Sequence, residues 1–340
     1  MRRLFTPGKL LILGLALLAV VLALVVLPSS QYIFLPDRAH PVSPLVTVPG
    51  GHDPKTGGVY FVDVVVRKAT LLERLFGGLH HGADLYPASA IDPPGVSDSG
   101  RQRIDLEDMH RSQQIAAAVA LKAAGKKVTL RSTGALIDAV EAGLPADGKL
   151  EQDDVITAVD GRPIRDPRGV FAAMSKRHIG DVVRFTIRRG NETLVVPIKT
   201  VASPTPPKRA VVGILLETAV DVRLPIPVKI DAGGVGGPSA GLAFALDVLE
   251  KLGRNVDHGY RVAATGEVDL AGDVLPIGGV KQKIIGVRRT GIDVFLVPAG
   301  DNATEAKRYA GKVRVIPVSS FQQALHALAT LPPRRVAASK

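Results

Sequence analysis

A serine and a lysine, 44 residues apart, are the residues of this sequence whose types and surroundings best suit covalent chemistry. Ser239 follows the segment Gly233–Gly237, which contains four glycines, and Lys283 lies in the apolar stretch that begins at Pro276. A serine hydroxyl becomes a good nucleophile only when a neighbouring base takes its proton. An amine can be that base only if desolvation lowers its pKa toward the working pH. The pair therefore predicts a serine nucleophile served by a lysine base.

The residues after the serine predict a buried helix from Ser239 to Leu249 that ends near Gly253, because they are apolar on nearly every side. Ser239 would then lie at a helix N-terminus, where the backbone N–H groups around Gly237 to Ala240 could hold a developing oxyanion. This arrangement suits acyl transfer. The alternative is that Ser239 serves only as a helix N-cap. A dinucleotide-binding turn is disfavoured, because a serine stands where G-x-G-x-x-G needs its third glycine.

Two lysines compete for the role of base. Lys281 and Lys283 are two residues apart and would point to different sides of a helix. Val280, Ile284 and Val287 form an apolar stripe at positions i, i+4 and i+7, and Lys283 neighbours two of them. The stripe favours Lys283, although a lysine in this place can also be a surface residue whose stem covers apolar neighbours.

Residues from about 211 to 317 resemble the proteolytic domain of the Lon family, which are serine peptidases with a Ser-Lys dyad. Four stretches carry the resemblance: Gly237–Gly241, Ala264–Val268, Gly272–Val280, and Lys283 ahead of Gly291–Pro298. The resemblance implies that Ser239 is the nucleophile, that Lys283 is the general base and that the Thr265 hydroxyl helps to orient the lysine amine. One departure is Gly236, where many relatives carry an acidic residue three positions before the serine.

A second resemblance covers the preceding part of the chain, which is similar to a PDZ domain from Leu136 to Ile164. Alternating apolar residues predict strands at Ala135–Val140, Asp154–Val159 and Val182–Arg188, a hairpin turn at Val159–Arg162 and a short helix at Pro167–Lys176. Leu130–Gly134 is expected to be the loop that faces a peptide carboxylate. PDZ domains add an extended peptide to a sheet edge. The alternative is that this unit gates the peptidase without binding a chain end.

Together these features predict an α+β protein with a Lon-type proteolytic domain of mixed sheet and helices, an inserted PDZ domain and one preceding transmembrane helix. A strand at Val59–Val66 and a helix at Met109–Ala124 are expected to pack with the peptidase, and Ala88–Arg103 is expected to be a surface loop. The expected segments are a basic segment 1–9, an anchor 10–27, a stalk 28–58, a strand and helix segment 59–124, a PDZ domain 125–202, a peptidase domain 203–332 and a tail 333–340.

The start of the sequence predicts the location of the protein. Leu10 to Leu27 is an apolar run interrupted only by Gly14, and it has the length needed to cross a membrane. Arg2, Arg3 and Lys9 precede this run, so the positive-inside rule puts the N-terminus in the cytoplasm and the catalytic part outside it. A cleaved signal peptide is the competing interpretation, but the apolar run is long and no A-x-A-like site follows it.

Composition excludes several classes of protein. The sequence has 340 residues, 46% of them hydrophobic, and no cysteine, so disulfides and thiolate chemistry are excluded. The net charge of +11 comes from scattered basic residues without a recognition motif, which argues against a nucleic-acid partner. His80 and His81 lack metal-ligand spacing and are expected to be solvated loop residues. Neither a metal nor a cofactor is expected.

The sequence therefore predicts a membrane-anchored, single-pass serine endopeptidase that cleaves extracytoplasmic or membrane-associated proteins, with the PDZ domain engaging the substrate. Independence from ATP is expected, because no G-x-x-x-x-G-K-[ST] loop occurs in the sequence. The Lon resemblance also implies a homo-oligomer, such as a hexameric ring. The alternative function is a non-catalytic, membrane-anchored PDZ scaffold.

Overall fold

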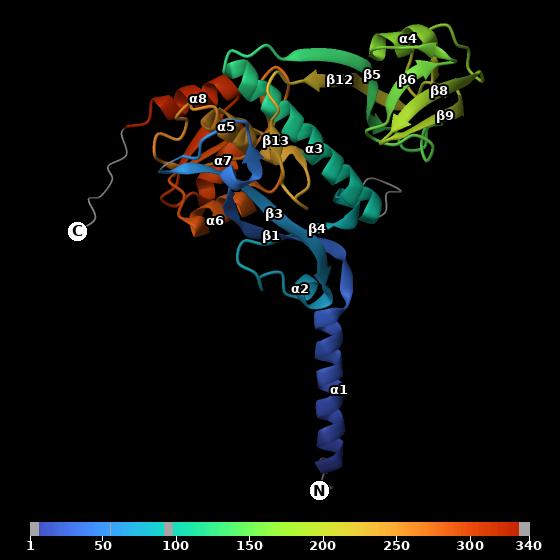
Figure 1. Ribbon diagram of the computed structural model, residues 1–340. Helices are drawn as coiled ribbons and strands as arrows, with labels where there is room; N and C mark the ends of the chain where they lie inside the picture. The colour runs from blue at the N-terminus through green and yellow to red at the C-terminus, as the bar shows by residue number, and fades with distance from the viewer. Residues whose placement is uncertain (1–6, 55, 92–97, 333–340) are drawn as a thin grey trace. The chain divides into compact units, whose positions relative to one another are not determined.

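The computed structural model describes residues 7–54, 56–91 and 98–332 and divides the chain into two compact units (Figure 1). The first unit contains residues 1–46, 52–93 and 239–340, and the second contains residues 47–51 and 94–238. Both units combine helices and strands, which confirms the expected α+β class. The first unit is discontinuous in sequence, because the second is inserted into it.

The first unit is built on a six-stranded mixed sheet with the strand order β18-β17-β14-β3-β1-β4. Its strands are β1 (Pro28–Pro41), β3 (Gly58–Thr70), β4 (Asp84–Pro87), β14 (Arg261–Ala264), β17 (Val294–Pro298) and β18 (Arg314–Val318). Its helices are α1 (Pro7–Val26), α2 (Leu71–Leu75), α5 (Gly241–Lys251), α6 (Val280–Thr290), α7 (Asp301–Tyr309) and α8 (Phe321–Ala329). Shorter elements are η1 (Ser43–Leu45), η2 (Ala88–Ala90), β15 (Glu267–Val268) and β16 (Val274–Leu275), and β2 (Val46–Thr47) lies at the boundary of the units.

Parallel and antiparallel pairing meet in this sheet at β3. Strand β14 pairs in parallel with β3 and β17, and β17 pairs in parallel with β18. Strand β1 is antiparallel to both β3 and β4. The predicted strand Val59–Val66 is confirmed as part of β3. Parallel pairing brings β3, which precedes the inserted unit in sequence, next to β14, which follows it.

The segment 28–58 is not the expected stalk, because its first half forms β1 and joins the sheet. The proline and glycine content of this segment indicates a stalk, but the prolines of β1 lie where strands tolerate them. Pro28 and Pro41 are the end residues of β1, and Pro36 lies where the pairing with β3 shifts register. Ile33 is only 1% exposed and belongs to the core.

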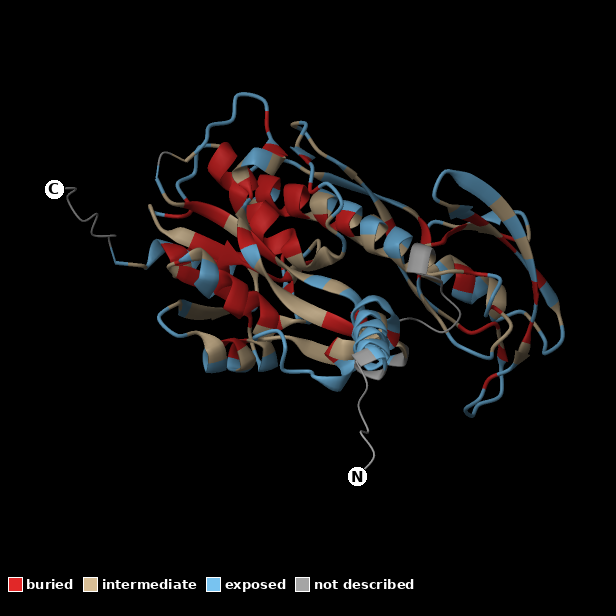
Figure 2. Ribbon diagram, turned by 90° about the horizontal axis from the view of Figure 1, so that it is seen from below, coloured by how far each residue is buried: buried red, intermediate tan, exposed pale blue. Residues whose placement is uncertain are grey.

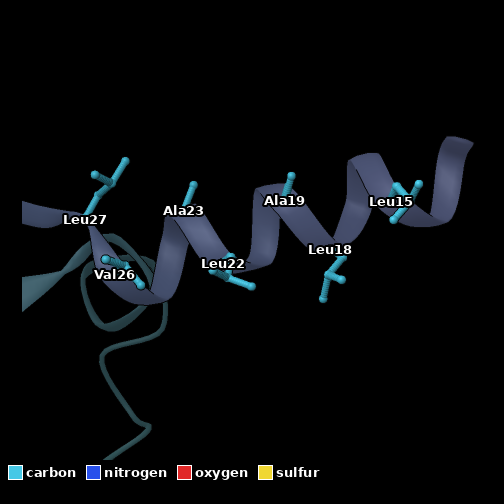
Figure 3. A pocket seen from close by; sticks show the side chains of 7 residues that line it. All are labelled: Leu15, Leu18, Ala19, Leu22, Ala23, Val26 and Leu27. Atoms are coloured by element: carbon cyan, nitrogen blue, oxygen red, sulfur yellow. The ribbon is translucent and has the colours of Figure 1, made fainter.

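Most of helix α1 is exposed, as its pale blue ribbon in Figure 2 shows, and its exposed residues include Leu11, Leu15 and Leu22. Figure 3 shows the side chains that line a shallow hollow on this helix and at its end, which are Leu15, Leu18, Ala19, Leu22, Ala23, Val26 and Leu27. Among the residues that the structure describes, no helix has both the length and the apolarity needed to span a bilayer. The transmembrane anchor expected over residues 10–27 is therefore not supported. Most of the expected basic segment 1–9 and the tail 333–340 lie outside the described residues.

Helix α6 packs its apolar stripe into the core of the first unit. Val280, Ile284 and Val287 belong to one buried cluster, which confirms the stripe predicted from the sequence. Gly286, on the same helix, lies so close to β1 that a Cβ atom there would be 1.7 Å from the carbonyl oxygen of Asp37. This close approach fixes the position of α6, and therefore of Lys283, against the sheet.

Substituting Gly286 by alanine is expected to destabilise the first unit by about 3 kcal/mol or more, because backbone atoms cannot move aside as a flexible side chain can. The measurement is the midpoint of thermal or urea unfolding. Gly278→Ala is the matched control, since nothing lies within 4 Å of a Cβ atom at that position. Equal midpoints for the two variants would contradict the tight packing of α6 on β1.

The second unit contains a six-stranded sheet in which β12-β5-β6-β8-β9 are neighbours and β7 pairs with β6. These strands are β5 (Thr129–Val140), β6 (Val155–Val159), β7 (Arg162–Pro163), β8 (Val182–Arg189), β9 (Glu192–Lys199) and β12 (Ile214–Arg223). The other elements are α3 (Asp98–Ala123), α4 (Pro167–Met174), β10 (Val201–Ala202), β11 (Ala210–Val211) and β13 (Lys229–Ile230). The turn η3 (Pro238–Ala240) joins this unit to the first.

Most elements predicted for the PDZ region are present. The three predicted strands correspond to β5, β6 and β8, and the predicted short helix is α4. The hairpin turn between β6 and β7 has Asp160 and Gly161 at φ values of 48° and 76°, the left-handed conformation that such turns require.

The segment Leu130–Gly134 is not a loop, in contrast to the prediction, but the first part of β5. Its residues pair with Ala219–Val222 of β12, so a second strand supplies the partners that the sequence did not suggest. Helix α3 begins at Asp98 and so covers part of the expected loop Ala88–Arg103, of which residues 92–97 lie outside the described residues. The helix predicted at Met109–Ala124 is confirmed but is longer.

Candidate active site

Ser239 lies in the turn η3, immediately before the buried helix α5. The N-cap of α5 is Ala240, which makes no side-chain capping bond, so Ser239 does not act as the N-cap. Its side chain is half-buried. The hydroxyl thus lies near the start of a helix but does not cap it.

Lys283 brings its amine to this hydroxyl from α6. Its Nζ atom donates a hydrogen bond of 2.7 Å to Ser239 Oγ and one of 3.0 Å to Thr265 Oγ1. The lysine is only 3% exposed and Thr265 is fully buried. The structure therefore brings together the three side chains that the sequence singled out as nucleophile, base and supporting hydroxyl.

The main chain of Ser239 is fixed by the residues that follow β14. Its carbonyl oxygen accepts a hydrogen bond from the Gly266 N–H (2.8 Å) and another from the Thr265 hydroxyl (3.1 Å). The Gly266 carbonyl in turn accepts the N–H of Leu242 at 3.0 Å. Thr265 consequently contacts both the lysine amine and the serine main chain, which fixes the position of the amine relative to the serine.

Burial lowers the pKa of the Lys283 ammonium to about 7, and the charge of Asp63 opposes this shift. Asp63 lies on β3, and burial is the main cause that raises the pKa of its carboxyl group. Asp37 raises that pKa further, whereas His40 and Lys283 lower it. A lysine whose pKa is near neutrality is partly uncharged at physiological pH, which is what a general base requires.

Lys281, the other candidate for the base, has a different environment. Its Nζ atom forms an ion pair of 2.6 Å with Asp84 Oδ1 and lies 5.9 Å from the centre of the Tyr309 ring. The bond to Asp84 raises the pKa of Lys281. A charged, paired amine is a poor proton acceptor, so the two lysines are clearly distinguished.

Of the two predicted oxyanion donors, Gly237 is already engaged. Its N–H donates a hydrogen bond of 2.7 Å to the carbonyl of Asp105 on α3, within the second unit. The next residue, Pro238, has no N–H, and its carbonyl accepts a bond of 2.9 Å from the buried Ser112 hydroxyl. Helix α3 therefore holds the chain just before the serine, and an oxyanion role for Gly237 would require its bond to break. The Ala240 N–H is the better candidate donor, because the hydrogen bond of Gly237 would have to break first.

The structure explains why this chain has a glycine, and not an acidic residue, at position 236. A Cβ atom at this position would lie 2.7 Å from Cβ of Asp105, and both residues belong to the second unit. The space that an acidic side chain would need is thus filled by Asp105. Burial is the main cause that raises the pKa of the Asp105 carboxyl group, and Arg101 lowers it.

Within the described residues, one group of side chains has the spacing to hold a metal ion, namely Asp37, His40 and Asp63. Their candidate ligand atoms lie within 4.8 Å of one another. His40 also forms a hydrogen bond of 3.3 Å with Asp37, so these groups satisfy one another in part. His80 belongs to a separate ion cluster, because its Nε2 atom lies 2.7 Å from Glu73 Oε1.

Comparison with known families agrees with this geometry. Residues 214–330 match the family described as the Lon protease (S16) C-terminal proteolytic domain, and residues 104–200 match the PDZ domain family. The range matched to the proteolytic domain begins at β12 in the second unit and continues through the last part of the first unit. Ser239, Thr265 and Lys283 all lie within the matched range, and the match supports a serine peptidase.

Two relatives illustrate how much of the chain is shared. The Lon protease of Azorhizobium caulinodans is 30% identical over 184 residues, which cover 53% of this chain and 21% of the relative. Lon protease 1 of Sorangium cellulosum is 41% identical over 95 residues, which cover 27% of this chain and 11% of the relative. The alignments thus span only a small part of these relatives' length. Among solved structures, the PDZ domain of an SdrC-like protein from Listeria monocytogenes covers 25% of this chain and 87% of its own, at 24% identity and a TM-score of 0.24, which is too low to carry an argument.

Sequence reasoning missed Asp63, whose charge acts on Lys283 of the Lon-type domain from outside the matched range. A signal was present, because Asp63 is the one charged residue in the apolar run Val59–Val66. Its relation to Lys283 depends on β3 joining the sheet beside β14, which the sequence alone does not indicate.

Proposed function

We propose that this protein is a serine endopeptidase in which Ser239 is the nucleophile and Lys283 the general base. The observation that carries the proposal is the 2.7 Å hydrogen bond between Lys283 Nζ and Ser239 Oγ, made by a lysine whose burial lowers its pKa to about 7. A neutral amine at this distance can take the serine proton as the oxygen attacks a carbonyl carbon. Neither the match to a Lon-type domain nor the geometry names the substrate, which we propose to be protein.

The proposed reaction has two halves. In the first, Ser239 Oγ forms a bond to the peptide carbonyl carbon while its proton passes to Lys283 Nζ. Lys283 then gives this proton to the departing amine, the C–N bond breaks, and an acyl-enzyme remains. In the second half, a water molecule loses a proton to Lys283 and attacks the acyl carbon, and the serine leaves with that proton. The Ala240 N–H is proposed to stabilise the oxyanion in both halves.

Thr265 is proposed as a positioning residue. Its hydroxyl accepts from the lysine amine and donates to the serine carbonyl, so it orients the base relative to the nucleophile. It has no role in bond making. Asp63 is proposed to keep the lysine pKa from falling further, because a nearby carboxylate favours the charged amine.

We further propose that the activity needs no ATP, since the sequence lacks the G-x-x-x-x-G-K-[ST] phosphate loop. Substrates would then be segments that are already unfolded, and the PDZ domain would help to engage them. The location outside the cytoplasm, the membrane attachment and the oligomeric state stay predictions from the sequence. The proposed chemistry depends on none of them.

The test of the activity is cleavage of an unfolded protein, such as casein, by purified protein without ATP. Ser239→Ala is expected to reduce cleavage by at least ~10³-fold, because the attacking oxygen is lost. Ser175→Ala, which removes an exposed hydroxyl on the second unit, is the matched control and should cleave normally. If the unsubstituted protein and Ser239→Ala were equally inactive against several unfolded proteins, the alternative of a non-catalytic PDZ scaffold would be favoured.

A further inference from the structure

The outer edge of β5 in the second unit is occupied by the chain itself. Strand β12 pairs antiparallel with β5 over the whole length of β12, from Ile214 opposite Val140 to Arg223 opposite Thr129, as the long ribbon in Figure 1 shows. PDZ domains bind extended peptides by adding them as a strand to a sheet edge. Strand β12 therefore lies where a peptide would add to β5.

The side chains of β12 pack as those of a bound peptide would. Besides β5, the strand contacts helix α4, so it lies in the groove between that helix and the sheet. Ile214 and Leu216 pack against the hydrophobic core of the unit, whereas Leu215 between them is 52% exposed. This alternation is the pattern by which a groove beside a sheet edge reads every second side chain.

The two residues just before β12 also form hydrogen bonds within the second unit. The Val212 carbonyl accepts the Ala146 N–H at 2.9 Å, and the Gly213 carbonyl accepts the Glu141 N–H at 3.0 Å. Val212 itself is a buried member of the core. Gly213 has a φ of +86°, and a Cβ atom there would lie 2.3 Å from Cβ of Leu144. These contacts fix the position at which the chain begins to pair with β5.

The pairing between β5 and β12 continues to the last residue of β12. The first residues of β5, Thr129 to Gly134, continue the ladder with Ala219–Arg223, where a loop facing a peptide carboxylate was expected. An occupant of this edge therefore passes through the groove instead of ending in it. The surface fits an internal, extended segment better than a chain end.

We propose that β12 is a built-in ligand of the PDZ domain, and that an extended peptide with apolar side chains two residues apart competes with it for the β5 edge. The partner is an unfolded protein segment, so this inference rests on the proposed function. The groove accepts the partner only when β12 leaves. Because β12 precedes the nucleophile in the chain, its release also frees the segment that leads toward Ser239.

The experiment uses the full chain carrying Ser239→Ala, so that binding is measured without cleavage. The probe is a fluorescent synthetic peptide that copies residues 212–223, read by fluorescence anisotropy. Leu136→Cys and Glu217→Cys, which face each other across the ladder, introduce the only two thiols of the chain. The disulfide should hold β12 in place and weaken probe binding by at least ~10-fold relative to the reduced form. Equal binding by the oxidised and reduced forms would overturn the proposal.

A second pair of variants tests the same point without a disulfide. Ile214→Ala combined with Leu216→Ala removes the two packed side chains from β12 and should tighten probe binding by roughly ten-fold, because a larger fraction of the protein is open. Leu215→Ala, on the same strand but exposed, should leave binding unchanged. Equal affinity in the double variant and the control would also refute the proposal. Casein cleavage by the same variants with Ser239 intact is measured separately, so that absent cleavage counts against the proposed activity and not against the role of β12.

Discussion

Replacing Lys283 by methionine is expected to reduce casein cleavage by on the order of 10²–10⁴-fold, the range that general base catalysis commonly contributes. Methionine keeps much of the apolar stem but offers no proton acceptor to Ser239. Lys281→Met is the matched control, because that lysine is paired with Asp84 and lies only two residues away on the same helix. The measurement is the initial rate of casein cleavage at equal protein concentration. If both variants lost activity equally, Lys283 would not be the specific base.

Loss of folding can be excluded by measuring the stability of the same variant. The folded-state pKa of Lys283, about 7, lies below the ordinary value of 10.5 for lysine. The unfolded chain therefore binds a proton more readily than the folded chain between these two pH values. This cost to the folded state is fully present below about pH 7 and disappears above pH 10.5. Lys283→Met removes it, so the inactive variant should unfold at a higher temperature than the parent at pH 7.

Much of the active site could be predicted because its parts are local in sequence. The glycines before Ser239 and the stripe of Val280, Ile284 and Val287 each define one element, and the stripe alone favours the lysine that contacts Ser239. The distance between the two elements could not be derived in the same way. It depends on α5 and α6 packing in one unit, and only the family resemblance indicated that they do.

Three of the differences share one physical cause, which is pairing between distant strands. Pro28, Pro36 and Pro41 suggested a stalk, but strand ends and a register shift accommodate all three. Leu130–Gly134 suggested a loop, because its partner strand β12 lies more than 80 residues later in the chain. Asp63 was overlooked for the same reason, since its neighbours depend on the pairing of β3 with β14. Local patterns identify a strand, but they do not reveal which strand will pair with it.

Cleavage should depend steeply on pH, because the base must be uncharged. With a Lys283 pKa of about 7, kcat/KM should rise by roughly ten-fold per pH unit below that value and level off above it. The carboxylate of Asp63 raises this pKa, so Asp63→Asn should lower it and move the rise in activity to a lower pH. The variant would then be more active than the parent under acidic conditions.

The measurement is the complete pH profile of kcat/KM for a small peptide substrate, recorded for the parent, Asp63→Asn and Asp84→Asn. Asp84→Asn is the matched control, since it also neutralises a carboxylate but the one that faces Lys281. Asp37 and His40 face Asp63, so the shift is judged by the difference between the two asparagine variants. A shift in Asp63→Asn alone links the rise in activity to the Lys283 amine. Identical profiles for both variants would mean that another group controls the rise, because a change of charge beside Lys283 cannot leave the pKa of that amine unchanged.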